Sequence, residues 1–293
     1  MARRTGVYPL AWSLRHLRRA RDEMRWCDYQ HALRKARFLV TRSQRAELAS
    51  LRRQLFDVRQ EGGEVRWRDK PIRYCDGRSL FHQLADIYLC GTYDFRSLNK
   101  NPTILDIGAN IGVAVRRCRE RFPGAHITAF EPDPNLVKVL RENVRVNWTD
   151  RQTEIVPCAT WVEDGEASFR STGGDTGALD ARGGTTVRTV NVAKFCAKPV
   201  DFLKLDVEGS ELPILSHLDA AGCLTNIKSM FVELHHWNGD RLCWHEALAL
   251  LDRSGFEYRI KSDLLGQPAA EIPFEHIAYP ASLASVHAWQ RKK

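Results

Sequence analysis

Two hydrophobic periods alternate along the chain, and together they predict an α/β fold. Short apolar runs rich in β-branched residues are typical of buried parallel strands, and Thr103 to Ile107 is such a run. Helical spacing follows from about Ile111 to Phe122, and Pro123-Gly124 ends it before another apolar run at Ile127 to Phe130. A third strand is expected over Thr153 to Pro157. This order predicts a parallel sheet whose strands are joined by helices.

The second half of the chain continues this pattern with one interruption. Gly, Asp, Ser and Thr are abundant between residues 163 and 186, which indicates a hairpin or an irregular insertion. Ser210 is expected to cap the helix that follows it. Met230 to Leu234 is a further strand, and Phe256 to Ile260 is expected to pair with His276 to Tyr279 and close the sheet.

The N-terminal quarter has a different pattern. Apolar residues recur at helical spacing among arginines in residues 9 to 60, which predicts two or three amphipathic helices. Glu64 to Tyr74 alternates as a strand or hairpin does, with Asp76-Gly77 as a turn. We therefore divide the chain into a basic, mainly helical N-terminal extension at residues 1 to 75 and a main domain at residues 76 to 293.

The positive charge of the chain is concentrated in that extension. The formal net charge is +8, and residues 1 to 60 alone hold fifteen Lys or Arg against five Asp or Glu, a balance of +10. The remaining residues therefore sum to −2, so the basic character says little about the rest of the chain. We expect the N-terminal helices to dock on the main domain or to form a homodimer, and we rank an anionic membrane surface or nucleic acid lower.

Other features of the composition bear on the cellular location of the protein. No apolar run approaches the roughly 20 residues that a membrane-spanning helix needs, so we expect no transmembrane segment. The arginine-rich start lacks the continuous apolar region of a signal peptide. The eight cysteines are scattered, without a C-x-x-C pair. We therefore expect a cytoplasmic protein with reduced thiols.

The turn after the Thr103 strand is the first candidate for chemistry. It runs Gly108-Ala109-Asn110-Ile111-Gly112, and Gly and Asn tolerate the positive φ that lets a ligand approach the backbone. Glu131 closes the next strand 23 positions after Gly108, near the spacing at which an acid binds a ribose diol. A dinucleotide fingerprint would need glycines where the chain has Asn110 and Val113, so we favour S-adenosylmethionine over NAD. The alternative is an ordinary connection between strand and helix.

Charged residues at the ends of two later strands are the second candidate. Lys204, Asp206 and Glu208 alternate, which would place them on one side of a strand, facing the crevice where open α/β sheets bind ligands. Glu233 and His235 share a face of the Met230 strand. Asp206, Glu208 and His235 are candidates for a general base, and Asp206 with Glu233 is an alternative pair for a divalent cation. For Lys204, a Lys–carboxylate pair that stabilises the strand end is the structural alternative.

These stretches together resemble the FkbM family of S-adenosylmethionine-dependent methyltransferases. The matching residues are LDIGANIG at 105–112, FEPD at 130–133 and VDFLKLDVEGSE at 200–211. The resemblance spans roughly residues 80 to 279. It implies a class I methyltransferase, Rossmann-like fold: a seven-stranded, mostly parallel sheet with helices on both faces and the last strand antiparallel.

The resemblance also implies which residues form the site. Those expected to bind S-adenosylmethionine lie in the matching motifs or at the end of the third strand: Gly108, Asn110 and Gly112 at the methionine end, Glu131 at the ribose, Ala159 on the adenine side, and Asp106 and Pro132 beside them. Those expected to be catalytic are Asp206, Glu208, His235 and Lys204. No acidic side chain is available at Pro157-Cys158-Ala159, so adenine recognition would rest on the backbone. A divalent cation is left open, but we do not predict one.

Most members of the family look like O-methyltransferases that act on hydroxyls of sugars and natural products. We therefore expect methyl transfer to a hydroxyl of a sugar, glycan or natural-product acceptor, a saccharide or another small molecule. RNA ribose methylation and a non-catalytic cofactor-binding scaffold are the alternatives. The slightly acidic main domain and the absence of an aromatic and basic stripe argue against RNA, so a nucleic-acid partner is not favoured.

Overall fold

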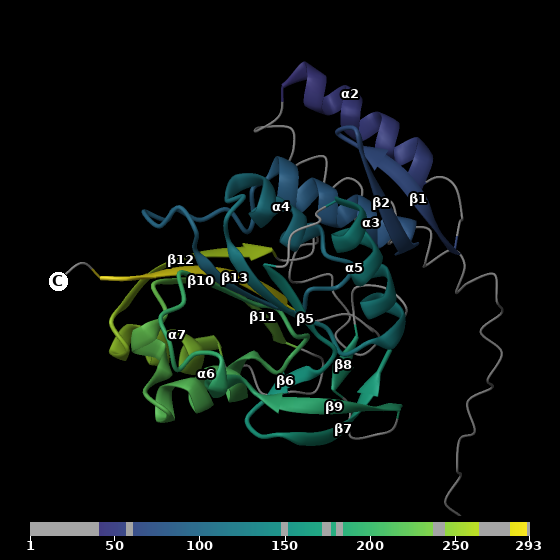
Figure 1. Cartoon of the computed structure of the whole chain (residues 1–293). Coiled ribbons are helices and arrows are strands. Elements are labelled where there is room, and N and C mark those ends of the chain that lie inside the picture. The colour runs from purple at the N-terminus through teal and green to yellow at the C-terminus, as the bar shows by residue number, and fades with distance from the viewer. Residues whose placement is uncertain are drawn as a thin grey trace, which may run out of the picture.

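A central sheet with helices on both sides forms the body of the protein (Figure 1). The computed structural model describes residues 41–56, 61–147, 152–171, 177–179, 184–236, 244–263 and 282–291. Helices α4 (Val113–Arg121) and α5 (Pro134–Asn147) pack on one side of the sheet. Helices α6 (Glu211–Ala220) and α7 (Trp244–Arg253) pack on the other.

The central sheet has seven strands in the order β12-β13-β11-β10-β3-β4-β5. Their bounds are β3 Thr103–Ile107, β4 His126–Phe130, β5 Thr153–Val156, β10 Phe202–Leu205, β11 Ser229–His236, β12 Phe256–Asp263 and β13 Ser282–Gln290. The strands from β5 to β11 run parallel, and β13 is antiparallel to both of its neighbours. The predicted seven-stranded, mostly parallel sheet with an antiparallel last strand is confirmed. The partner of β12 is β13, and the expected partner, His276 to Tyr279, lies outside the described residues.

Strand β3 shows why the sheet strands are apolar on both faces. Leu105 and Ile107 belong to the core under α6 and α7, whereas Ile104 belongs to the core under α4 and α5. Successive side chains of a strand point to opposite faces, so each face of the sheet requires its own set of apolar residues. The charged side chain within β3, Asp106, is buried and lies 3.4 Å from Lys204 Nζ of β10.

The N-terminal part of the described chain is a helix, a hairpin and a second helix. Its elements are α2 Arg42–Leu51, a π-helical turn Arg52–Phe56, β1 Glu61–Trp67, β2 Lys70–Asp76, α3 Gly77–Leu84 and a π-helical turn Ala85–Leu89. The hairpin is confirmed, but its turn lies at Arg68 and Asp69, which have φ of +48° and +63°. The prediction of a turn at Asp76-Gly77 is wrong, because the Asp76 side chain caps α3 by accepting a hydrogen bond from Ser79 N at 2.7 Å.

These N-terminal elements dock on the main domain. Buried leucines of α2 share one core with Val113 and Leu136 of the domain. Asn143 of α5 accepts a hydrogen bond from Arg73 N at 2.8 Å and donates one to Arg73 O at 3.0 Å, which ties the hairpin to α5. Residues 1–40, where the other N-terminal helices were expected, lie outside the described residues. The homodimer and the division of the chain at residue 75 stay predictions.

A second, smaller sheet is inserted between β5 and β10. Its strands are β6 Ala159–Trp161, β7 Gly165–Arg170, β8 Ala178–Leu179 and β9 Thr185–Asn191, in the order β6-β9-β7-β8. Strand β7 pairs antiparallel with both β8 and β9, so the polar stretch forms part of a small antiparallel sheet rather than a single hairpin. Ala159, Phe169 and Val187 form a small core of this sheet, which lies below the central sheet in Figure 1.

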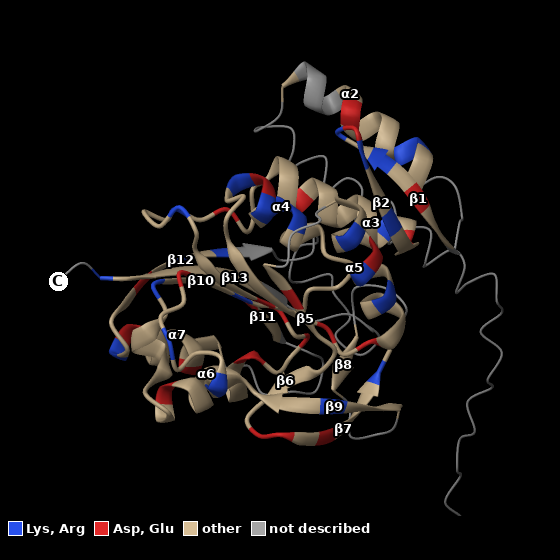
Figure 2. Ribbon diagram, viewed as in Figure 1, with Lys and Arg blue, Asp and Glu red and all other residues tan. Residues whose placement is uncertain are grey.

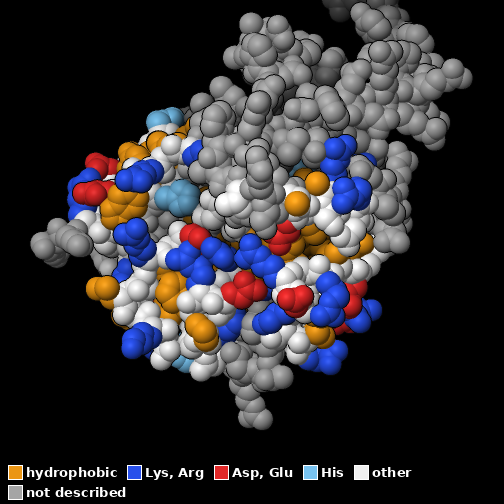
Figure 3. Space-filling model, turned by 90° about the horizontal axis from the view of Figure 1, so that it is seen from above, with side chains coloured by type: hydrophobic (Ala, Val, Ile, Leu, Met, Phe, Trp, Pro, Cys, Tyr) orange, Lys and Arg blue, Asp and Glu red, His pale blue; other side chains and the backbone are white. Residues whose placement is uncertain are grey.

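Charges of both signs are mixed over the described surface (Figure 2). In the view from above, Lys and Arg side chains lie beside Asp and Glu side chains (Figure 3). Arg117 and Arg121 of α4 both contact Asp94, at 2.7 and 2.5 Å. Within the described ranges, the helices are too short or too polar to cross a bilayer.

Candidate active site

A cavity lies at the carboxyl edge of the parallel strands, where ligands of open α/β sheets bind. Its wall includes eight of the predicted site residues: Gly108, Asn110, Glu131, Pro132, Ala159, Lys204, Asp206 and Glu208. Three predicted residues, Asp106, Gly112 and His235, are not among those that line it. Leu179 and Phe169 of the small sheet also line the cavity, so the insertion closes one side of it.

The first glycine of the turn lies where no side chain fits. Gly108 has φ of +81°, and a Cβ added to it would lie 1.9 Å from the carbonyl oxygen of Asp206. Lys204 donates a hydrogen bond to Gly108 O at 2.7 Å, and the N–H groups of Gly108 and Ala109 both donate to Phe130 O, at 3.1 and 2.8 Å. The turn is therefore held closely between the ends of β10 and β4.

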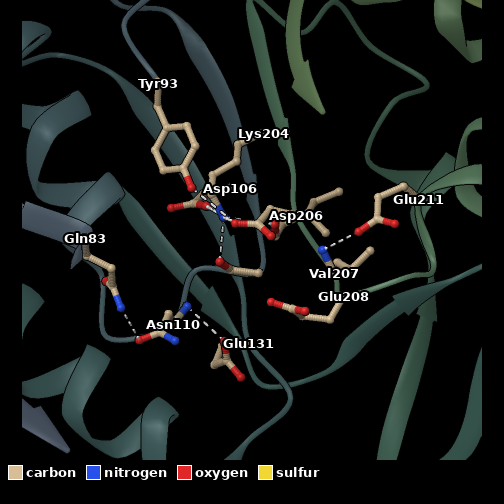
Figure 4. Close-up of polar contacts among 12 residues, drawn as sticks. Gln83, Tyr93, Asp106, Asn110, Glu131, Lys204, Asp206, Val207, Glu208 and Glu211 are labelled. Atoms are coloured by element: carbon tan, nitrogen blue, oxygen red, sulfur yellow. Dashed lines mark hydrogen bonds and ion pairs between the residues drawn. The ribbon is translucent and has the colours of Figure 1, made fainter. Parts of the chain in front are cut away.

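Asn110 and Gly112 complete the turn in different ways. Asn110 has φ of +51°, and its Oδ1 accepts hydrogen bonds from Ile111 N at 2.7 Å and from Gln83 Nε2 at 3.2 Å (Figure 4). Gly112 has φ of +89°, and a Cβ there would lie 2.6 Å from Leu140 Cδ1. The glycine at 112 thus permits close packing of α5 behind the cavity, whereas Asn110 forms part of the cavity wall.

Glu131 closes β4 with its carboxylate held in the cavity wall. One oxygen accepts a hydrogen bond from Asn110 N and the other from Asp133 N, both at 2.9 Å. Burial raises the pKa of Glu131 from 4.5 to about 7, although both N–H groups oppose the shift. Each carboxylate oxygen has a second acceptor position. The arrangement is suited to accepting hydrogen bonds from the two hydroxyls of a ribose.

Lys204 joins two buried acids to the glycine turn. Its Nζ lies 3.4 Å from Asp106 Oδ1 and 3.3 Å from Asp206 Oδ2, and its side chain is 4% exposed. Burial lowers the pKa of Lys204, but Asp206 and Asp106 outweigh it and raise that pKa, so the ammonium stays charged. Burial raises the pKa of Asp106, which Lys204 opposes. These ion pairs support the structural alternative for Lys204, since they fix the strand end against the turn.

Asp206 lines the cavity, and the groups around it keep its carboxylate ionised. Tyr93 donates a hydrogen bond from its hydroxyl to Asp206 Oδ2 at 3.2 Å (Figure 4). Burial raises the pKa of Asp206, but Lys204 and His235 outweigh it and lower that pKa, so Asp206 is ionised. Burial and the charge of Asp206 raise the pKa of Glu233 well above its ordinary value.

Glu208 reaches the cavity by a turn rather than by strand alternation. The alternation of Lys204, Asp206 and Glu208 was expected to continue along one strand, but β10 ends at Leu205. Glu208 has φ of +57°, so the chain has already turned there. The three side chains still line one cavity. The proximity was predicted correctly, but the backbone geometry was not.

Glu211 holds both this turn and His235. Its carboxylate accepts hydrogen bonds from Val207 N and Gly209 N, both at 3.1 Å, and its Oε1 lies 2.9 Å from His235 Nδ1. Ser210 is the N-cap residue of α6, as expected, but its side chain makes no capping hydrogen bond. The carboxylate at the next position satisfies the turn instead.

His235 is buried behind the carboxylates that line the cavity. Its side chain is 4% exposed, and its Nε2 lies 3.4 Å from Glu208 Oε2 and 4.0 Å from Asp206 Oδ1. Burial lowers the pKa of His235, but Glu211 and Glu208 outweigh it and raise that pKa well above 6.5. A buried ring that does not line the cavity is poorly placed to act as a general base on a bound substrate. The structure therefore favours the two carboxylates over His235 for direct contact with a substrate.

The same three side chains could hold a metal ion. In the described parts of the chain, Asp206, Glu208 and His235 are the group whose ligand atoms all lie within 4.8 Å of one another. Glu233, considered as the partner of Asp206 in a cation site, is not part of this group.

The sequence of this domain matches a known family over the same residues that build the cavity. A family model described as the methyltransferase FkbM domain matches residues 106–258, which is more than half of the chain. The chain belongs to the FkbM methyltransferase family. The resemblance inferred from the three motifs is thereby confirmed, and methyl transfer is the activity that the family supports.

Relatives of this FkbM methyltransferase are distant. The methyltransferase sdnD of Sordaria araneosa is 27% identical over 212 residues, which cover 59% of this chain and 80% of that protein. A solved FkbM methyltransferase from Methylobacillus flagellatus KT is 15% identical, with a TM-score of 0.46, over 74% of this chain and 56% of that one. Precorrin-6y C5,15-methyltransferase from Geobacter metallireducens GS-15 is 14% identical, with a TM-score of 0.39, over 69% and 84%. The residue roles therefore rest on this chain's own geometry.

Two residues of this FkbM site were missed by sequence reasoning. Gln83 comes from α3, far before the glycine turn, and no motif marks it as a contact of Asn110. Glu211 lies in the third motif, where a glutamate at the start of a helix was the available signal. Its contact with His235 joins the start of α6 to the end of β11, which spacing along the chain does not encode.

Proposed function

We propose that this FkbM methyltransferase uses S-adenosylmethionine to methylate a hydroxyl of a sugar, glycan or natural-product acceptor. The observation that carries the proposal is a single cavity whose wall includes the glycine turn, Glu131, Asp206 and Glu208. The turn and Glu131 suit a nucleoside cofactor. The carboxylates of Asp206 and Glu208 suit a hydroxyl group that must lose a proton.

The residues around the glycine turn fit S-adenosylmethionine. The positive φ of Gly108 and Asn110 gives a backbone that a ligand can approach, and a Cβ at 108 would have no room. Glu131 offers acceptor positions for a ribose, and the backbone at Ala159 forms the wall on the adenine side. Pro132 completes that wall, whereas Asp106 and Gly112 support it from behind. When bound, the cofactor supplies a methyl group activated by its sulfonium.

Asp206 and Glu208 would act on the acceptor. The ionised carboxylate of Asp206 is fixed by Lys204 and Tyr93, so it can accept a hydrogen bond from a hydroxyl placed at this end of the cavity. Holding that hydroxyl in line with the methyl group contributes the most, because orientation alone is worth up to about 7–11 kcal/mol. A carboxylate that takes up the proton as the oxygen is methylated adds about 10²- to 10⁴-fold in rate.

RNA ribose methylation is not favoured as an alternative. Binding to RNA depends on Lys and Arg side chains that are available to phosphates. Arg73 contacts Glu64 and Glu142, and Arg117 and Arg121 both contact Asp94. The charge of these arginines is therefore largely balanced within the protein.

The test is methyl transfer from radiolabelled S-adenosylmethionine to a panel of sugars, glycans and hydroxylated natural products. Asp206→Asn should bind the cofactor within about threefold of wild type and lose at least about 10²-fold in turnover. Asp164→Asn is the matched control, because Asp164 is an exposed carboxylate paired with Lys194 and does not line the cavity. Full activity of Asp206→Asn would remove Asp206 from the mechanism. Cofactor binding without incorporation into any acceptor would favour the non-catalytic scaffold.

A further inference from the structure

We propose that the acceptor end of the cavity holds a divalent first-row transition-metal ion, bound by Asp206, Glu208 and His235. The role of the ion, which is to bind the acceptor hydroxyl, rests on the proposed function. Binding of the ion itself can be measured without an acceptor.

The first support is the separation of the donor atoms. His235 Nε2 lies 3.4 Å from Glu208 Oε2 and 4.0 Å from Asp206 Oδ1. A charge-assisted N–H to carboxylate hydrogen bond spans about 2.7–2.9 Å, so both separations are longer than direct hydrogen bonds. Two ligands that share an ion at about 2.0–2.2 Å each lie roughly 3–4.2 Å apart. Both separations from His235 are thus those of ligands that share one ion, and the ligand atoms of all three residues lie within 4.8 Å of one another.

The second support is how the neighbouring groups orient these atoms. Lys204 and Tyr93 contact Oδ2 of Asp206, whereas Oδ1 is the oxygen nearer His235. Glu211 contacts Nδ1 of His235 at 2.9 Å, which places Nε2 on the side of the two other carboxylates. Histidines that bind metals usually have a carboxylate or carbonyl on the second ring nitrogen. Glu211 occupies that position.

The third support is the balance of charge in a buried region. The carboxylates around this end of the cavity are Asp106, Asp206, Glu208 and Glu211. Lys204 is a cationic partner of two of them, and His235 adds a positive charge only when its ring is protonated. Buried charges require partners of the opposite sign. A divalent cation between Asp206, Glu208 and His235 would offset part of this excess.

The ligand types indicate which ions the site prefers. Imidazole suits Zn²⁺, Fe²⁺ and similar ions, whereas Mg²⁺ and Ca²⁺ prefer oxygen ligands alone. Asp206 and Glu208 line the cavity, so an acceptor hydroxyl can reach an open position on the ion. A hydroxyl bound there would lose its proton more readily, to a carboxylate oxygen of Glu208 that does not bind the ion, without any change in the oxidation state of the ion.

The test is Mn²⁺ binding to the full-length protein after removal of metals by dialysis against a chelator. Calorimetry and electron paramagnetic resonance should detect one Mn²⁺ per chain, and Zn²⁺ should displace it. Glu208→Gln should weaken binding at least about tenfold, and Glu211→Gln about 10- to 100-fold through the orientation of His235. Glu166→Gln, which changes an exposed glutamate of β7, should bind as wild type does.

Two results would overturn the metal site: no saturable binding of Mn²⁺ or Zn²⁺, or equal affinity in wild type and Glu208→Gln. Circular dichroism of each variant establishes that it is folded before its affinity is compared. S-adenosylmethionine binding is measured on the wild-type protein in parallel. Cofactor binding without metal binding would refute this inference alone, whereas metal binding without cofactor binding would refute the proposed function.

Discussion

Replacing Gly108 by alanine tests whether the glycine turn is shaped for the cofactor. The substitution adds one methyl group, which would lie 1.9 Å from the carbonyl oxygen of Asp206. Real Cβ atoms essentially never approach closer than 3.0 Å, and both the turn and β10 contribute backbone here. The turn must therefore move away from β10, and the hydrogen bond from Lys204 to Gly108 O lengthens with it.

The expected loss has two parts. An L-residue in the left-handed region costs about 1–2 kcal/mol. Weakening the hydrogen bond from the charged Lys204 adds about 1.5–3 kcal/mol, so the free energy of unfolding should fall by roughly 3–5 kcal/mol. In a protein of this size each kcal/mol lowers the melting temperature by about 2–4 °C. Affinity for S-adenosylmethionine should fall at least about tenfold, which corresponds to 1.4 kcal/mol.

Gly222→Ala is the matched control for this substitution. Gly222 also has a positive φ, +67°, but a Cβ added there meets no atom within 4 Å. The free energy of unfolding of Gly222→Ala should fall only by the conformational cost of about 1–2 kcal/mol, and its affinity for S-adenosylmethionine should not change. Both variants are compared with wild type by urea denaturation and by calorimetric titration with S-adenosylmethionine. The reasoning is refuted if Gly108→Ala binds the cofactor as wild type does and loses no more stability than Gly222→Ala.

Other outcomes concern the ionised groups. Lys204→Met leaves two buried carboxylates without their ammonium and should lower the free energy of unfolding by about 3–5 kcal/mol. Lys228→Met is the control, because Lys228 is 63% exposed, and its free energy of unfolding should fall by under about 1 kcal/mol. Both variants are measured by denaturant titration, and equal losses would contradict the role of Lys204. Affinity for S-adenosylmethionine should fall as the pH drops below about 7, because Glu131 then takes up a proton. Calorimetric titrations above and below that pH test this, and an affinity that does not change with pH would contradict it. Since the folded-state pKa of Glu131 lies above its ordinary 4.5, the stability it contributes is present at low pH and is lost as the pH rises through about 7. Glu211→Gln should lower the pKa of His235 in an NMR titration, and an unchanged value would show that Glu211 does not set it.

The central sheet could be predicted because its strands are buried on both faces. Continuous apolar runs such as Thr103 to Ile107 follow directly from that burial. Strand β13 was not predicted, because its buried side chains include the small residues Ala284 and Ala288, which give a weak hydrophobic signal. The short strands β6 and β8, of three and two residues, are too brief to show a period.

The site could be predicted in part for a similar reason. Parallel strands end at one edge of a sheet, so the acids that follow β4 and β10 had to lie near the glycine turn. What failed was the extension of strand alternation to Glu208, whose φ of +57° belongs to a turn. The contacts of Gln83 with Asn110 and of Glu211 with His235 depend on how helices and strands pack, and no local pattern encodes that.

Binding of S-adenosylmethionine tests the central claim most directly. The measurement is a calorimetric titration of the wild-type protein with S-adenosylmethionine, alone and in the presence of NAD. The account predicts one site with a dissociation constant on the order of micromolar, unaffected by NAD. No binding, or binding displaced by NAD, would contradict it and return the turn at Gly108 to an ordinary connection between strand and helix.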